Sequence, residues 1–141
     1  TSVSTLITHL FHNSDIGCSA FLGGISTNLD SNFIYNPNSQ YCVVEADEFD
    51  RSFLRLNPFV SIITSCDADH LDIYEDEADL RSTFSSFAAK TNPQGALFVK
   101  KGLQLYLPSS PKNFSYSIRN AFGQSSCSEY KYQTYYRLST N

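Results

Sequence analysis

Acidic side chains gather in two short stretches of this 141-residue chain. Glu45, Asp47, Glu48 and Asp50 fall within six residues, and a second group of aspartates surrounds His70. Each stretch directly follows a short apolar run, which is typical of a buried parallel strand. Because ligands of open parallel sheets bind outside the carboxyl ends of the strands, we expect both stretches at one edge of a sheet.

Carboxylates packed this densely repel one another unless a cation lies nearby. Mg²⁺ prefers hard oxygen ligands and commonly keeps the phosphate oxygens of a substrate, and a neutral histidine can serve a second metal ion. The density therefore favours a metal or phosphate site, with Glu45 and His70 as its central candidates. The alternative is that these acids are solvated loop residues or caps of following helices, which is the usual role of a lone Asp or Glu.

Apolar periodicity predicts the elements that position the two acidic stretches. A helical stripe occupies residues 4–11, where Thr1 or Ser2 could cap the helix. The strongest helical pattern covers residues 77–90, and the Asn-, Ser- and Pro-rich segment 28–40 indicates a loop. Four apolar runs are typical of strands: 16–22, which ends at a Gly-Gly pair, 41–46, 59–64 and 96–99.

Strands that alternate with helices, followed by strands alone, predict an α/β domain. We expect a mostly parallel sheet flanked by helices, with a small β extension. Residues 1–102 would form the α/β core and residues 103–141 the β-rich extension. Strands are predicted within the extension at 103–107, 114–118 and 130–138.

Composition and charge restrict the classes of function. The chain is 41% apolar and 17% charged, which indicates a globular protein. Its net charge of −4 argues against sequence-independent binding of nucleic acid. No apolar run is long enough for a membrane span and no signal-peptide pattern is visible, so we expect a cytoplasmic protein with no membrane partner.

The four cysteines do not have the spacing of a metal site. We expect them to act mainly as small buried apolar side chains in a reducing compartment. An extracellular disulfide pair is the alternative.

Four ordered stretches resemble the central domain of the ATP-dependent Mur ligases, in the branch that joins L-alanine to UDP-N-acetylmuramate. The resemblance rests on VVEADEFDRSFLRLNP and SIITSCDADHLDIY, preceded by CSAFLGGISTN and followed by GALFVKKG. Their combination in this order is far more specific than any one of them. The resemblance implies a nucleotide-binding domain with a fold like that of the P-loop NTPases, with ATP and Mg²⁺ as cofactors.

The resemblance also implies roles for individual residues. Thr1 matches the last residue of a Gly-Lys-Thr phosphate loop, whose hydroxyl coordinates Mg²⁺, although the glycines and lysine of that loop are absent from this chain. Glu45 matches a Mg²⁺-binding glutamate near the γ-phosphate of ATP. His70 matches a histidine that serves a second Mg²⁺ beside the acceptor carboxylate. Four further residues are implied to face the UDP-sugar substrate: Gly23, Gly24, Asp47 and Glu48.

The implied reaction belongs to the synthesis of peptidoglycan precursors. The γ-phosphoryl group of ATP passes to the muramoyl carboxylate, and the amine of L-alanine then displaces phosphate from the acyl phosphate, leaving an amide. The chain has no Met and opens on Thr1 within an expected helix. We therefore expect a fragment that is inactive by itself and whose partners are the missing N- and C-terminal domains of the same enzyme.

Three other hypotheses remain open at this point. A related ligase that attaches a recycled tripeptide to UDP-N-acetylmuramate shares the same central motifs. A non-catalytic module that binds nucleotide or metal would account for the absent Gly-Lys residues. A metal hydrolase built on the DADH sequence at 67–70 would bind a divalent metal tightly without nucleotide.

Overall fold

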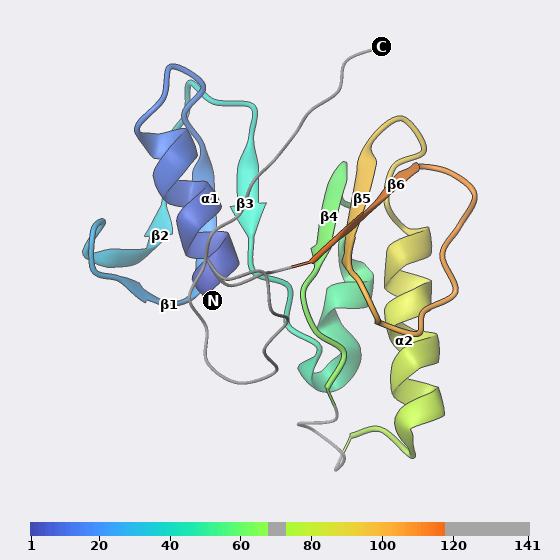
Figure 1. Ribbon diagram of the computed structural model, residues 1–141. Coiled ribbons are helices and arrows are strands. Elements are labelled where there is room, and N and C mark those ends of the chain that lie inside the picture. The colour runs from blue at the N-terminus through green and yellow to red at the C-terminus, as the bar shows by residue number, and fades with distance from the viewer. Residues whose placement is uncertain (68–72, 118–141) are drawn as a thin grey trace, which may run out of the picture. The chain divides into compact units, whose positions relative to one another are not determined.

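The computed structural model describes residues 1–67 and 73–117 and divides into two compact units (Figure 1). The first unit is Thr1–Glu48, and the second begins at Phe49. Each unit contains a three-stranded sheet of its own together with helices. The predicted α/β class is therefore confirmed, and the second sheet is parallel throughout.

The first unit combines one helix with a mixed sheet in the order β2-β1-β3. Strand β1 pairs with β2 antiparallel and with β3 parallel. Alternate residues of β1, Ala20 and Leu22, are buried, as is Thr8 of the helix. The helix contacts β1 and β3, so this alternation buries one face of β1 in the small core. The elements are α1 (Ser2–His12), β1 (Ser19–Ser26), β2 (Ser31–Ile34) and β3 (Cys42–Val44).

The second unit is a parallel sheet in the order β4-β5-β6, and helix α2 forms the crossover between β4 and β5. The Asp76 side chain caps α2 by accepting a hydrogen bond of 2.8 Å from the backbone N–H of Asp79. Phe53 is buried against the rings of Phe84 and Phe87 in α2. The elements are the 3₁₀ segment η1 (Phe49–Arg55), β4 (Val60–Ile63), α2 (Glu77–Ala89), β5 (Ala96–Lys100) and β6 (Lys112–Tyr116).

Two loop and strand predictions were wrong. The predicted loop 28–40 contains β2. Residues of β2 pair with β1, and the centroids of the Phe33 and Phe21 rings lie 4.9 Å apart. The predicted strand 103–107 is not a strand, because the backbone N–H of Tyr106 donates instead to the Ser85 hydroxyl of α2, at 3.1 Å. In both cases a long-range partner, which the local pattern does not contain, decided the conformation.

Strand bounds and burial also differ in part from expectation. Strand β1 continues through the Gly-Gly pair to Ser26, and β6 begins two residues before the predicted strand 114–118. Strand β3 is parallel as predicted, but it lies at a sheet edge and its Cys42 and Val44 are exposed. The predicted strand 130–138 lies outside the described residues, and the division near residue 102 stays a prediction.

The two strands that precede the acidic stretches belong to different sheets among the described residues: β3 to the first and β4 to the second. The expectation that the two acidic stretches lie at one edge of a sheet stays a prediction, because these strands belong to different units and His70 lies outside the described residues. Neither of the described helices has the length and apolarity that a membrane crossing requires.

Among the described cysteines, only Cys18 matches the expected burial; Cys42 is exposed and Cys66 half-buried. Burial, together with the neighbouring Cys42 thiol, raises the pKa of Cys18, which leaves little reactive thiolate.

We expect N-ethylmaleimide to modify Cys42 at least about tenfold faster than Cys18 in the folded chain. Peptide mass spectrometry after quenching measures both rates. The modification rates of Cys18 and Cys42 should become equal in urea. A Cys42 that reacts as slowly as Cys18 in the folded chain would contradict the exposure of Cys42.

Candidate functional site

The Glu45 carboxylate is an acidic group of the first unit that both hydrogen bonds and an ion pair hold in place. Glu45 directly follows β3, and its backbone N–H donates to the Phe21 carbonyl of β1 at 2.8 Å, which extends the parallel pairing by one residue. The carboxylate thereby lies beside both β1 and the start of α1. Three separate segments of the first unit meet at this one side chain.

Both oxygens of the Glu45 carboxylate accept hydrogen bonds. Oε1 accepts from the Thr1 hydroxyl at 2.8 Å and pairs with the Thr1 α-ammonium, also at 2.8 Å. Oε2 accepts from the backbone N–H of Gly23 at 2.8 Å and from the Ser4 hydroxyl at 2.9 Å. The donors come from the N-cap residue of α1, its first turn and the middle of β1.

These contacts keep Glu45 ionised. Burial alone raises the pKa of this carboxyl group, but the Thr1 ammonium, the Gly23 N–H and the hydroxyls of Thr1 and Ser4 together outweigh it and lower the pKa to about 2. The N-terminus of a helix also favours an anion beside it. A fixed negative charge therefore lies at the start of α1 at neutral pH.

The donor set fits a magnesium ion. Thr1 Oγ1 and Glu45 Oε1 are 2.8 Å apart. Two neighbouring ligands of an octahedral Mg²⁺ with metal–oxygen distances of roughly 2.0–2.1 Å are separated by about 2.9 Å. Both atoms are hard oxygens, and the hydroxyl oxygen can accept as well as donate. The two oxygens are thus already spaced as adjacent ligands of one ion.

The other predicted site residues are distributed differently. Gly23 and Gly24 lie within β1, and Gly23 contacts the Glu45 carboxylate directly. Asp47 is exposed and Glu48 half-buried, both just beyond β3. His70 lies outside the described residues, so its pairing with Glu45 stays a prediction.

Sequence reasoning missed Ser4. Its hydroxyl reaches both Glu45 Oε2 and the Thr1 carbonyl oxygen, the latter at 2.7 Å. The available signal was its spacing from Thr1, because residues three apart share one face of a helix. A hydroxyl at that spacing from a predicted metal ligand was a candidate that the sequence already contained.

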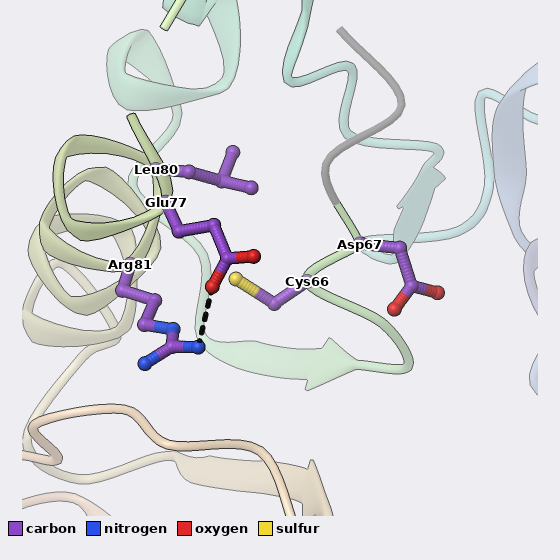
Figure 2. A pocket seen from close by; sticks show the side chains of 5 residues that line it. All are labelled: Cys66, Asp67, Glu77, Leu80 and Arg81. Carbon is purple, nitrogen blue, oxygen red and sulfur yellow. Dashed lines mark hydrogen bonds and ion pairs between the residues drawn. The ribbon is translucent and has the colours of Figure 1, made fainter. Parts of the chain in front are cut away.

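The described part of the second acidic stretch borders a small polar pocket of about 180 Å³. Figure 2 shows Cys66 pointing toward Glu77 and Asp67 pointing away from it. The Glu77 carboxylate is paired with Arg81 at 2.9 Å. Within residues 1–67 and 73–117, no three His, Cys, Asp or Glu side chains gather in a way that could hold a metal ion.

Comparisons with known proteins add a consistent set of relatives. The chain is 46% identical over 119 residues to the UDP-N-acetylmuramate–L-alanine ligase of Phocaeicola vulgatus, covering 83% of this chain and 26% of that protein. It is 50% identical over 103 residues to the ligase of the same name from Christiangramia forsetii, covering 73% of this chain and 23% of the relative. The corresponding ligase of Cytophaga hutchinsonii is 35% identical over 136 residues, which is 94% of this chain and 28% of the relative.

The chain spans about a quarter of the length of these curated relatives. No protein-family model matches it. The matched region includes most of the chain in each relative, and all three relatives carry the same name. The chain therefore belongs to the Mur ligase family, as a segment homologous to part of the UDP-N-acetylmuramate–L-alanine ligases.

Proposed function

We propose that this chain is the central part of an ATP-dependent ligase that joins L-alanine to the carboxylate of UDP-N-acetylmuramate. The reaction would form an amide through an acyl phosphate, in the synthesis of peptidoglycan precursors in the cytoplasm. The names of the relatives support the substrates. The observation that carries the proposal within this chain is the Glu45 carboxylate, held at the start of α1 with the Thr1 hydroxyl 2.8 Å from Oε1.

Thr1 and Glu45 would hold one Mg²⁺ beside the phosphates of ATP. When bound, this ion would neutralise charge that develops during phosphoryl transfer. Glu45 is suited to the role because it is a carboxylate at the start of α1 whose two oxygens are held by Thr1, Ser4 and Gly23. We assign His70 to a second Mg²⁺ on the resemblance alone.

The remaining predicted residues would face the sugar nucleotide. Two of them, Asp47 and Glu48, follow Glu45 closely in the sequence, and Gly24 is next to Gly23 in β1. Their position supports a place for substrate next to the metal. Gly23 belongs to the same group, although its N–H is engaged by Glu45. The grip on the UDP group and the amino-acid pocket would come from regions of the enzyme beyond this chain.

A coupled phosphate-release assay with ATP, UDP-N-acetylmuramate and L-alanine tests the proposal. The 141-residue chain alone is expected to show no turnover, because it lacks the Gly-Lys residues that hold the β- and γ-phosphates. The protein encoded by the whole reading frame around this chain is expected to release phosphate only with both acceptor substrates present.

Three outcomes would contradict these expectations. Turnover by the isolated chain would show that it is sufficient for catalysis. A whole-frame protein that uses a tripeptide in place of L-alanine would identify the recycling ligase, and one that neither binds nor hydrolyses ATP would leave only a binding module.

A further inference from the structure

We propose that Gly23 and Ser4 are positioning residues that together hold one oxygen of the Glu45 carboxylate, so that the other oxygen is presented with the Thr1 hydroxyl to a divalent cation. This inference rests on the proposed function, because it concerns the same cation site. It gives Gly23 a role toward the metal in addition to any contact with substrate. It also assigns a role to Ser4, which no sequence motif indicated.

The two carboxylate oxygens have partners of different kinds. Oε2 accepts from the Gly23 backbone N–H, at 2.8 Å, and this group can only donate. Oε2 also lies 2.9 Å from the Ser4 hydroxyl, whose single proton is shared with the Thr1 carbonyl oxygen. A cation at Oε2 would have to displace this strand N–H from the carboxylate.

Oε1, by contrast, faces groups that a cation can replace or join. The Thr1 hydroxyl, 2.8 Å away, can turn its proton aside and offer a lone pair to a metal. The other neighbour of Oε1 is the positively charged Thr1 α-ammonium. A divalent cation at Oε1 would take the place of this ammonium and meet a hydroxyl that can turn, whereas at Oε2 it would have to displace the Gly23 N–H, so Oε1 is the oxygen that can be presented to a metal ion.

The missing side chain of Gly23 allows this arrangement. A Cβ atom at Gly23 would lie 2.7 Å from Oε1 and 2.9 Å from Cδ of Glu45. Those atoms end a flexible side chain, so alanine at this position would push the carboxylate aside rather than distort the strand. A Cβ at the adjacent Gly24 would meet only the Thr1 methyl group, at an ordinary 3.5 Å. Gly24→Ala is therefore a matched control.

The test is Mn²⁺ binding to the ¹⁵N-labelled 141-residue chain, followed by paramagnetic broadening of the Ala46 amide signal in NMR spectra. We expect Gly23→Ala and Ser4→Ala each to weaken Mn²⁺ affinity by about tenfold or more, the usual effect of removing a group that orients a metal ligand. Ser4→Thr, which keeps the hydroxyl, should restore affinity to within about twofold of the unaltered chain. The exposed Ser2→Ala should leave it unchanged, and Gly24→Ala, whose Cβ does not reach Glu45, should weaken it less than Gly23→Ala does.

The variants separate two kinds of failure. If Glu45→Gln broadens the Ala46 signal as strongly as the unaltered chain does, the proposed cation site itself is wrong. If Glu45→Gln abolishes the broadening while Gly23→Ala and Ser4→Ala bind Mn²⁺ normally, the site stands and the positioning roles are overturned. Dispersed amide spectra establish that each variant is folded, and the Ser4→Ala and Ser4→Thr pair decides the question if Gly23→Ala does not fold.

Discussion

Gly95→Ala is expected to lower the free energy of unfolding by about 3 kcal/mol or more. A Cβ atom at this position would lie 1.7 Å from the Phe59 carbonyl oxygen and 2.8 Å from its carbon, both of which are backbone atoms. The same carbonyl accepts from the N–H of Ala96 at 3.2 Å, where β4 and β5 begin to pair. Relief of the clash therefore requires β4 and β5 to separate at their start.

Urea unfolding followed by far-ultraviolet circular dichroism measures this loss. Gly102→Ala is the control, because Gly102 has a φ of +99° but a Cβ there would meet nothing within 4 Å. That substitution tests backbone strain alone and should cost about 1–2 kcal/mol. Equal losses for the two variants would contradict the steric explanation for Gly95.

Acid is expected to destabilise the chain through Glu45, and Glu45→Gln should remove this dependence. The ordinary pKa of the carboxyl group is 4.5, and its contacts in the folded chain lower the pKa to about 2. A depressed pKa stabilises the folded state fully above pH 4.5, and this stabilisation is lost as the pH falls toward 2. Because the partner ammonium is half exposed, we expect a contribution of roughly 1–2 kcal/mol rather than the full value implied by the shift.

The measurement compares the free energy of unfolding of the unaltered chain and Glu45→Gln from pH 7 to pH 2. The variant should be less stable at pH 7, and the two curves should converge near pH 2. Glu77→Gln provides a control, since the Glu77 side chain is 68% exposed and its ion pair with Arg81 lies on the helix surface. It should change stability by less than about 0.5 kcal/mol. Parallel curves for Glu45→Gln and the unaltered chain would show that Glu45 is not held as described.

Local signals were sufficient for the helix α2 and for the strands on either side of it. The predicted helix 77–90 differs from the observed Glu77–Ala89 by one residue. The predicted strand 59–64 contains β4, and the predicted strand 96–99 is one residue shorter than β5. Each of these elements has a complete apolar pattern within its own residues, and α2 also ends just before a proline. Their identity therefore did not depend on distant contacts.

Long-range pairing decided what the local pattern could not. Strand β2 lies in a segment whose Asn, Ser and Pro content is typical of a loop, and only its pairing with β1 makes it a strand. Residues 103–107 have a strand-like pattern but form no strand. The backbone N–H of Tyr106 donates instead to the hydroxyl of Ser85 in α2. The separation of β3 and β4 into two sheets likewise depends on which strands lie beside them, which periodicity does not encode.

The sequence by itself determined which chemical groups are present: a glutamate after an apolar strand, a threonine at a helix start and a glycine pair upstream. It also carried the relationship to the Mur ligases, now confirmed by the relatives. Only the tertiary structure brought Thr1, Ser4 and Gly23 to a single carboxylate, across as many as 44 residues of chain. The physical reason is that a hydrogen bond requires its partners within about 3 Å, and the packing of α1 and β3 against β1, rather than any local spacing, places them there.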